Sequence, residues 1–357
     1  MRKLIIITLF AFLACSALPA GAEPIQVVCS LFPVYDFARQ VGGDLAAVQL
    51  LLPPGAEAHS FEPRPQDVRL MNDAALFVFT GKEMEPWALR IAQSLEGPVV
   101  VDASEGISLL PNEDEHSPEE EEEEEEEEHE HEHEHGHEHE HEHHHHHVLD
   151  PHVWLDLSLA QRMVDNIAAG FCAADLENAD SYRRNAAAYK AQLAELDSEI
   201  QSLVEKSERH TLVFGGRFAC RYFLRHYGLS WVTAYDGENE PGMRRIAEVV
   251  HYIKEHGVRY LFHDEFAEPR IARSIAEQTG ASLLLFHTAH NLTRKELDEG
   301  VTFLDIMRGN RDALALALAQ PPRGDCASLR QGRPAGSPQG TMRRDAVALR
   351  KHGSLAP

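Results

Sequence analysis

Residues 180–207 read DSYRRNAAAYKAQLAELDSEIQSLVEKS and carry the clearest helical pattern in the chain. Apolar side chains recur there at steps of three, four and seven residues, at Tyr182, Tyr189, Leu193, Leu196, Ile200 and Leu203. This spacing places one apolar stripe along an α-helix. At about 1.5 Å per residue, such a helix is about 40 Å long, which is the length of a domain. We expect it to join two folded parts of the chain as a rigid strut.

On both sides of this helix, short apolar runs alternate with amphipathic segments. Before it, candidate strands lie at 25–29, 48–52, 76–80 and 99–102, and candidate helices at 37–41, 65–73 and 87–95. After it, candidate strands lie at 211–214, 231–235, 258–262 and 282–286, and candidate helices at 218–227, 243–256, 270–279 and 303–318. Such alternation predicts a mainly parallel sheet with helices on its faces. The predicted fold is therefore α/β, with two lobes, each with a mainly parallel sheet, joined by one long rigid helix.

The first residues have the pattern of a secretory signal peptide. Arg2 and Lys3 precede a short apolar core at 4–13, and small residues at 20–22 suit a cleavage site. We expect a mature, soluble chain that begins at Glu23 and is exported to the periplasm. Cys15 leaves a lipoprotein as the alternative, which Phe12 three places earlier disfavours.

A low-complexity segment at 113–147 interrupts the first lobe. It holds a run of glutamates, a His-Glu alternation and five closing histidines, and almost nothing apolar, so we expect it to be disordered. The chain carries a net charge of −25, of which this segment supplies 19 negative charges and no positive one. The remaining chain is only weakly acidic, and its charge argues against a nucleic-acid partner. Imidazoles and carboxylates are ligands of Zn²⁺ and related ions, so metal handling is the working hypothesis and an acidic spacer the alternative.

The expected organisation follows from these patterns. Its segments are a signal peptide at 1–22, an N-terminal lobe at 23–112, a disordered acidic His-rich loop at 113–147, the end of the N-terminal lobe at 148–179, a linking helix at 180–208, a C-terminal lobe at 209–320 and a disordered tail at 321–357. The cysteines that remain after cleavage, Cys29, Cys172, Cys220 and Cys326, show no C-x-x-C spacing, and the sequence does not choose among their possible pairings. The match of 129–133 to the zinc-protease pattern H-E-x-x-H is automatic in an alternating repeat, so we give it no weight.

Three histidine-bearing loops follow strands or precede helices. His59 lies in the loop PPGAEAHSFEP at 53–63, between a strand and a helix. His152 lies in DPHVW at 150–154, directly after the His-rich segment. The stretch FHTAHN at 286–291 ends a strand of the second half. Ligands usually bind at the carboxyl edge of parallel strands, where such loops meet.

With these motifs, the chain resembles the cluster A-I metal-specific substrate-binding proteins of bacterial ABC importers, which take zinc or manganese. The resemblance covers residues 24–318. It rests on the ordered motifs Pro-Gly-x-x-x-His-x-x-Glu-Pro at 54–63, Asp-Pro-His-Val-Trp at 150–154, Tyr-Gly-Leu at 227–229 and Glu-Pro at 240–241, with the His-rich insertion typical of zinc-type members. It implies two α/β lobes joined by a long helix, with the metal held between them.

The resemblance implies a ligand set with one departure. His59 and His152 match the family's first two ligands, whereas Arg217 stands where the family has its third histidine. A guanidinium has no lone pair to offer a cation. His287 matches a position where many members place an aspartate ligand and is the first choice for the third place. Glu265 is the next, with a salt bridge to Arg217 as its alternative role. The remaining candidates are His263, His290 and Glu240.

The expected function is capture of Zn²⁺ between the lobes and delivery to the membrane permease of an ABC transporter, by a monomer with no enzymatic activity. Three imidazoles suit tetrahedral Zn²⁺, and a set richer in carboxylate would favour Mn²⁺. Binding requires neutral histidines, so affinity is expected to fall as the pH drops through about 6.5. The alternatives are a periplasmic zinc buffer or metallochaperone without a transporter, an Mn²⁺-specific binding protein, a zinc hydrolase and an adhesin.

Overall fold

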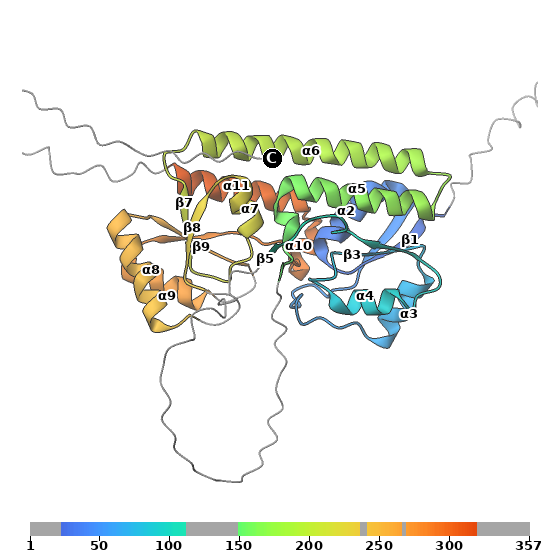
Figure 1. Cartoon of the computed structure of the whole chain (residues 1–357), viewed down its shortest axis with the longest axis horizontal. Helices are drawn as coiled ribbons and strands as arrows, with labels where there is room; N and C mark the ends of the chain where they lie inside the picture. Colours follow the sequence, from blue (N-terminus) through green and yellow to red (C-terminus); the bar gives the residue numbers. More distant parts are fainter. Residues whose placement is uncertain (1–22, 112–148, 236–240, 266–268, 320–357) are drawn as a thin grey trace, which may run out of the picture. The chain divides into compact units, whose positions relative to one another are not determined.

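The computed structural model describes residues 23–111, 149–235, 241–265 and 269–319. The predicted signal peptide, acidic His-rich loop and tail, as well as Glu240, lie outside the described residues. The described part contains two four-stranded parallel sheets, each covered by helices, and a long helix that runs along both (Figure 1). The predicted fold class is thereby confirmed.

The N-terminal lobe is built on a sheet with strand order β2-β1-β3-β4, in which every pair is parallel. Its strands are β1 (Ile25–Cys29), β2 (Ala46–Leu50), β3 (Leu76–Phe79) and β4 (Val99–Asp102). One face is covered by α2 (Phe32–Gly42) and α5 (Leu157–Ala174), and the other by α3 (Pro65–Asp73) and α4 (Pro86–Ala92). All four residues of β3 are buried, as expected for a parallel strand with helices on both faces.

The C-terminal lobe repeats this plan with strand order β10-β9-β7-β8, again entirely parallel. Its strands are β7 (Thr211–Phe214), β8 (Ser230–Thr233), β9 (Tyr260–His263) and β10 (Ser282–Leu285). Its outer face is covered by α8 (Met243–His256) and α9 (Arg270–Thr279), and its inner face by α7 (Arg221–His226) and α11 (Phe303–Leu318). A short helix, α10 (Arg294–Glu299), follows β10.

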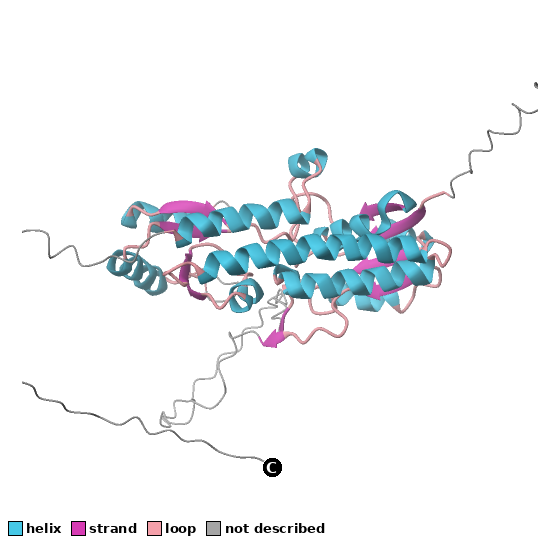
Figure 2. Ribbon diagram, turned by 90° about the horizontal axis from the view of Figure 1, so that it is seen from above, coloured by secondary structure: helices cyan, strands magenta, loops and turns pink. Residues whose placement is uncertain are grey.

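Helix α6 (Ala179–Glu205) spans both lobes. Its side chains join one continuous core with residues of α2 and α5 in the first lobe and of β7, α7 and α11 in the second. Figure 2 shows the long helices lying side by side. The ring of Tyr182 packs on that of Phe171 in α5, with 4.8 Å between ring centroids. Just beyond the other end of α6, the Ser207 hydroxyl donates to the Leu318 carbonyl oxygen at the end of α11. The helix is therefore anchored to a different lobe at each end.

A short antiparallel pair brings the chain back to the first lobe. Strands β5 (Leu110–Pro111) and β6 (Leu149–Asp150) flank the segment that is not described. The Tyr222 hydroxyl on α7 of the second lobe accepts from Leu110 N–H and donates to the Asp150 carbonyl oxygen. After β6, the 3-10 helix η2 (Val153–Leu155) leads into α5. The C-terminal lobe thus contacts the backbone two residues before His152.

A second tie between the lobes comes from a buried carboxylate. Asp36 of α2 accepts a hydrogen bond at 3.0 Å from the N–H of Phe303, the first residue of α11. It also accepts one from the Tyr189 hydroxyl of α6 at 3.4 Å. Burial raises the pKa of Asp36, and these donors oppose that shift. One side chain therefore joins both lobes and the linking helix.

His226, at the end of α7, makes a third tie and gives a pH prediction. Its ring nitrogens lie 3.3 Å from Asp156 Oδ2 and 2.8 Å from Asp197 Oδ1, on α6. The two carboxylates raise the pKa of His226 to about 10. The stability gained is fully present below the unfolded value of about 6.5 and is lost as the pH rises through about 10. We expect His226→Gln to cost about 1.5–3 kcal/mol at pH 7 and to flatten the loss of stability between pH 7 and 10.

Urea unfolding of both proteins at pH 6.5, 8 and 10 measures this effect. His251→Gln is the control, because that side chain is exposed on α8 and its single carboxylate contact, to Glu255, is exposed as well. Parallel pH profiles for the wild type and His226→Gln would contradict the assignment of the pH dependence to His226.

The structure also bears on the cysteines and on the question of a membrane-spanning helix. Cys29, Cys172 and Cys220 are free thiols in the structure, and Cys326 lies beyond the described residues. Within the described ranges, no helix combines the length and apolar character needed to cross a bilayer.

Candidate metal centre

Three histidines from three separate loops converge between the lobes. His59, His152 and His290 each present one ring nitrogen, and these atoms all lie within 4.8 Å of one another. The ring centroids are 4.8 to 5.4 Å apart. Zinc–nitrogen bonds of about 2.0–2.1 Å would place tetrahedral ligand atoms about 3.3 Å apart, so a small side-chain adjustment brings this set onto one ion. Among the described residues, this is the one group of three or more His, Cys, Asp or Glu that meets the spacing of a metal site.

His59 comes from the loop between β2 and α3 of the first lobe. Two prolines and Gly55, whose φ is +77°, turn the chain sharply after the strand. The backbone N–H of His59 donates to Glu57 Oε1 at 3.3 Å. The other Glu57 oxygen lies 3.2 Å from an Arg217 nitrogen of the second lobe. The His59 loop therefore meets the opposite lobe beside the histidines.

His152 is oriented by the carboxylate two residues earlier. Its Nδ1 lies 2.7 Å from Asp150 Oδ1, which also accepts from the His152 backbone N–H. Burial alone would raise the pKa of Asp150, but His152 and Arg221 lower it below its ordinary value. An ionised Asp150 accepts a hydrogen bond from Nδ1–H and so leaves the lone pair on Nε2, which is buried and has no hydrogen-bond partner.

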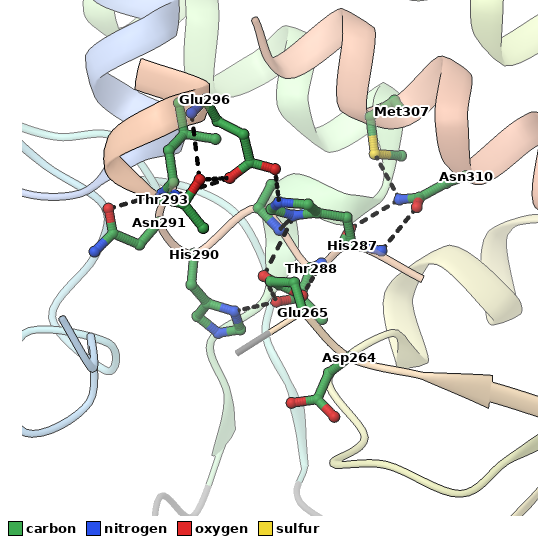
Figure 3. A network of polar contacts seen from close by, with 12 residues as sticks. Asp264, Glu265, His287, Thr288, His290, Asn291, Thr293, Glu296, Met307 and Asn310 are labelled. Atoms are coloured by element: carbon green, nitrogen blue, oxygen red, sulfur yellow. Dashed lines mark hydrogen bonds and ion pairs between the residues drawn. The ribbon is translucent and has the colours of Figure 1, made fainter. Parts of the chain in front are cut away.

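His290 is oriented by a relay through Thr288. The Thr288 hydroxyl donates to Glu265 Oε1 at 2.7 Å, and the Thr288 N–H donates to Glu265 Oε2 at 2.8 Å (Figure 3). The same hydroxyl lies 2.5 Å from His290 Nδ1. Because the Thr288 hydroxyl donates its one hydrogen to Glu265, it accepts a hydrogen bond from His290 Nδ1–H, and the imidazole keeps its lone pair on Nε2. That Nε2 is also buried without a hydrogen-bond partner. A buried, unpaired nitrogen costs free energy, so two of them facing one point indicate a site for a cation.

The loop that carries His290 is held in an unusual backbone conformation. Ala289 is the one non-glycine residue of the described chain with a positive φ, at +58°. A side chain in this left-handed region costs roughly 1–3 kcal/mol when the surroundings impose it. The Ala289 N–H donates to His287 Nδ1 at 3.0 Å, which stabilises the turn. The turn directs His287 and His290 to different surroundings.

Electrostatics keep His290 neutral without a metal. Burial lowers its pKa well below the ordinary histidine value, and positive charge on His152, His59, His287 or Arg217 would lower it further. A neutral imidazole is the form that binds a metal, so His290 would not have to lose a proton first.

His287, the first choice for the third ligand, is not a member of the converging group. Its backbone N–H and carbonyl both bond to the side chain of Asn310 on α11. Its Nδ1 accepts from Ala289, and its Nε2 lies 3.9 Å from a Glu296 oxygen of α10 (Figure 3). Burial lowers the pKa of His287 to about 4, so it is a neutral, buried residue. The third member of the converging group is His290, one of the remaining candidates.

Glu265 and Arg217 also differ from the expectation. Glu265 lies behind Thr288 rather than among the converging nitrogens, and burial raises its pKa to about 7. Arg217 pairs with Glu57 and not with Glu265. His263 is also outside the group, with its Nδ1 2.8 Å from the Asp264 carbonyl oxygen.

The chain matches one family model over most of its length. Residues 27–317 match the model described as zinc-uptake complex component A, periplasmic. The high-affinity zinc uptake system protein ZnuA of Bacillus subtilis is 34% identical over 301 residues, which cover 83% of this chain and 88% of that protein.

Solved structures agree with the fold. The metal-dependent lipoprotein YcdH of Bacillus subtilis is 30% identical, with a TM-score of 0.67 over 82% of this chain and 99% of that one. The Zn(II)-bound AdcA of Streptococcus pneumoniae is 26% identical with a TM-score of 0.67, over 84% of this chain and 59% of that one. This chain therefore spans little more than half of AdcA.

Proposed function

The chain belongs to the family of periplasmic zinc-uptake complex component A, and from that premise we propose that it captures Zn²⁺ between its lobes and delivers it to the permease of an ABC importer. The observation that carries the proposal is the convergence of His59, His152 and His290. The family consists of solute-binding proteins for zinc uptake and not of enzymes, so the expected event is reversible coordination without chemical turnover.

The donor set supports zinc as the cargo. Three imidazole nitrogens leave one position of a tetrahedron for water or another oxygen ligand, an arrangement that Zn²⁺ adopts readily. Mn²⁺ prefers carboxylate and water oxygens, and Glu265, the first carboxylate expected as a ligand, is engaged with Thr288. The relatives named above as zinc uptake and Zn(II)-bound proteins support the same choice.

The acidic His-rich segment at 113–147 has an accessory role, which is to collect zinc weakly near the cleft. Strands β5 and β6 flank it along the chain and pair with each other, and β6 ends at Asp150, the residue that orients His152. Ions collected weakly along the segment would be released close to the three histidines. Export to the periplasm and a monomeric state belong to the same proposal.

Competitive zinc titration tests capture in the cleft. The intact chain and a variant without residues 113–147 are titrated against a chelator, together with His59→Ala and His152→Ala in the shortened background. We expect one tight site to survive the deletion and each histidine substitution to weaken it severely. Loss of all tight binding with the deletion would contradict capture by the three histidines and leave the segment as a loose metal sponge.

Delivery to a permease requires a separate test. The chain should restore growth of a zinc-uptake-deficient strain in chelated medium when its cognate permease is present. A chain that binds zinc tightly but never restores growth would be a buffer or metallochaperone.

A further inference from the structure

The loops that carry His59 and His290 are joined directly to each other across the two lobes. The side-chain amide of Asn291 donates to the Pro53 carbonyl oxygen at 2.7 Å and to the Ala56 carbonyl oxygen at 3.0 Å. In return, the Gly55 N–H donates to the Leu292 carbonyl oxygen at 2.8 Å. We call these three hydrogen bonds the loop junction.

Asn291 is the centre of the loop junction, and its side-chain conformation is fixed. Its side chain is fully buried, both of its amide hydrogens are used across the lobes, and its Oδ1 accepts from the Leu292 N–H. Buried hydrogen bonds of this kind fix a side chain. If they break, the buried donors and acceptors have no water to bond with, and this costs free energy. The backbone next to Asn291 is therefore fixed relative to the opposite lobe.

The junction stands next to two of the three histidines. Asn291 immediately follows His290, and the stretch 53–56 ends three residues before His59. Gly55 reaches the junction with a left-handed φ that other residues adopt only with strain. His152 is held differently, by the side chain of Asp150 at the end of β6, whose carbonyl oxygen accepts from the Tyr222 hydroxyl. The junction thus joins the loops of His59 and His290 directly, and none of its three hydrogen bonds involves the loop of His152.

We propose, on the basis of the proposed zinc capture, that Asn291 is a positioning residue that sets the gap between His59 and His290 before the ion arrives. When the gap is already set, zinc binding does not include the free-energy cost of bringing the two loops together. A preset gap also favours an ion of one size, since selectivity in nitrogen sites comes from geometry more than from intrinsic affinity. Asn291 itself does not contact the ion.

The first test measures zinc and cadmium affinity of the full chain by chelator competition. Cd²⁺ serves as a larger ion with the same closed d shell. We expect Asn291→Ala to weaken zinc binding by about 10–100-fold, the usual effect of removing a group that orients a ligand. Cadmium affinity should fall less, so the zinc-to-cadmium ratio drops. Unchanged zinc affinity in Asn291→Ala would overturn the proposal.

Asn166→Ala is the matched control. The Asn166 amide also donates to two backbone carbonyl oxygens, of Ala103 and Glu105, at 2.9 and 3.0 Å, but all three residues belong to the N-terminal lobe. A general loss of stability would affect both variants, whereas the proposal requires zinc affinity to change only in Asn291→Ala. An equal loss of zinc affinity in Asn166→Ala would overturn it.

Double substitutions separate positioning from a merely structural role. Combined with His59→Ala, Asn291→Ala should have little further effect on zinc affinity, since the gap it sets no longer matters. Combined with His152→Ala, its effect should persist, because His59 and His290 are still present. Equal effects in both backgrounds would overturn the assignment. If Asn291→Ala does not fold, Asn291→Leu, which keeps the branched outline of the side chain and removes both donors, takes its place throughout.

The same data distinguish failure of this inference from failure of the proposed function. If the wild type and His152→Ala bind zinc equally weakly, there is no cleft site and the proposed function fails. If the wild type binds tightly, His152→Ala does not, and Asn291→Ala matches the wild type, the cleft site stands and the positioning role of Asn291 fails.

Discussion

Replacing His290 with alanine is expected to reduce zinc affinity by roughly 150- to 900-fold, whereas replacing His287 with asparagine should change it by no more than about threefold. Zinc sites in proteins bind with about 10–16 kcal/mol shared among four ligands, so one lost imidazole costs roughly 3–4 kcal/mol. His290 contributes one of the three converging nitrogens, and His287 does not. Affinity is measured by chelator competition in the chain without residues 113–147.

The substitution at His287 is chosen to leave the turn intact. Its Nδ1 accepts from the Ala289 N–H, and an asparagine oxygen can accept from the backbone two residues on in the same way. His287→Asn therefore removes the imidazole but keeps the bond that supports the left-handed Ala289. Tight binding that survives His290→Ala and disappears in His287→Asn would reverse the assignment and restore the ligand set predicted from the sequence.

The difference between these two histidines shows where sequence reasoning ends. His287 and His290 are three residues apart in one loop, and no periodicity distinguishes them, because the loop is neither helix nor strand. Their separation depends on the left-handed Ala289 and on bonds to distant residues, Glu265 through Thr288 and Asn310 on α11. A short polar stretch does not reveal such partners. The only signal in the sequence was that the stretch contains two histidines. This predicts that one of them is a ligand but does not say which one.

The regular elements were far more predictable, since burial leaves a periodic trace in the sequence. Strands β1 and β7 have the bounds that their apolar runs indicate. Strand β2 begins and ends two residues earlier than predicted, because Leu51 and Leu52 are buried in the loop that follows and extend the apolar run. The buried stripe of α6 ends on Val204, which lies four residues after Ile200, and not on Leu203. The pair β5–β6 is only two residues long and leaves no such trace.

Replacing Trp154 with alanine is expected to cost about 3–5 kcal/mol of folding stability and to weaken zinc binding as well. The Trp154 side chain is fully buried. The centroid of its ring lies 5.3 Å from the ring centroid of His152 and 5.2 Å from that of His290. Its Nε1 donates across the lobes to the Thr288 carbonyl oxygen at 2.9 Å. Truncation therefore leaves a cavity behind two of the converging histidines and a buried acceptor without its donor.

Phe171→Ala separates the two effects, because Phe171 is equally buried but packs on Tyr182 of α6, away from the three histidines. Both variants should lose similar stability in urea unfolding without metal. Zinc at one hundred times its dissociation constant stabilises a protein by about 2.7 kcal/mol, and Phe171→Ala should keep that increment. At the same zinc concentration, Trp154→Ala should lose most of it. Equal increments in the two variants would mean that Trp154 supports the core alone and that the histidines hold their positions without it.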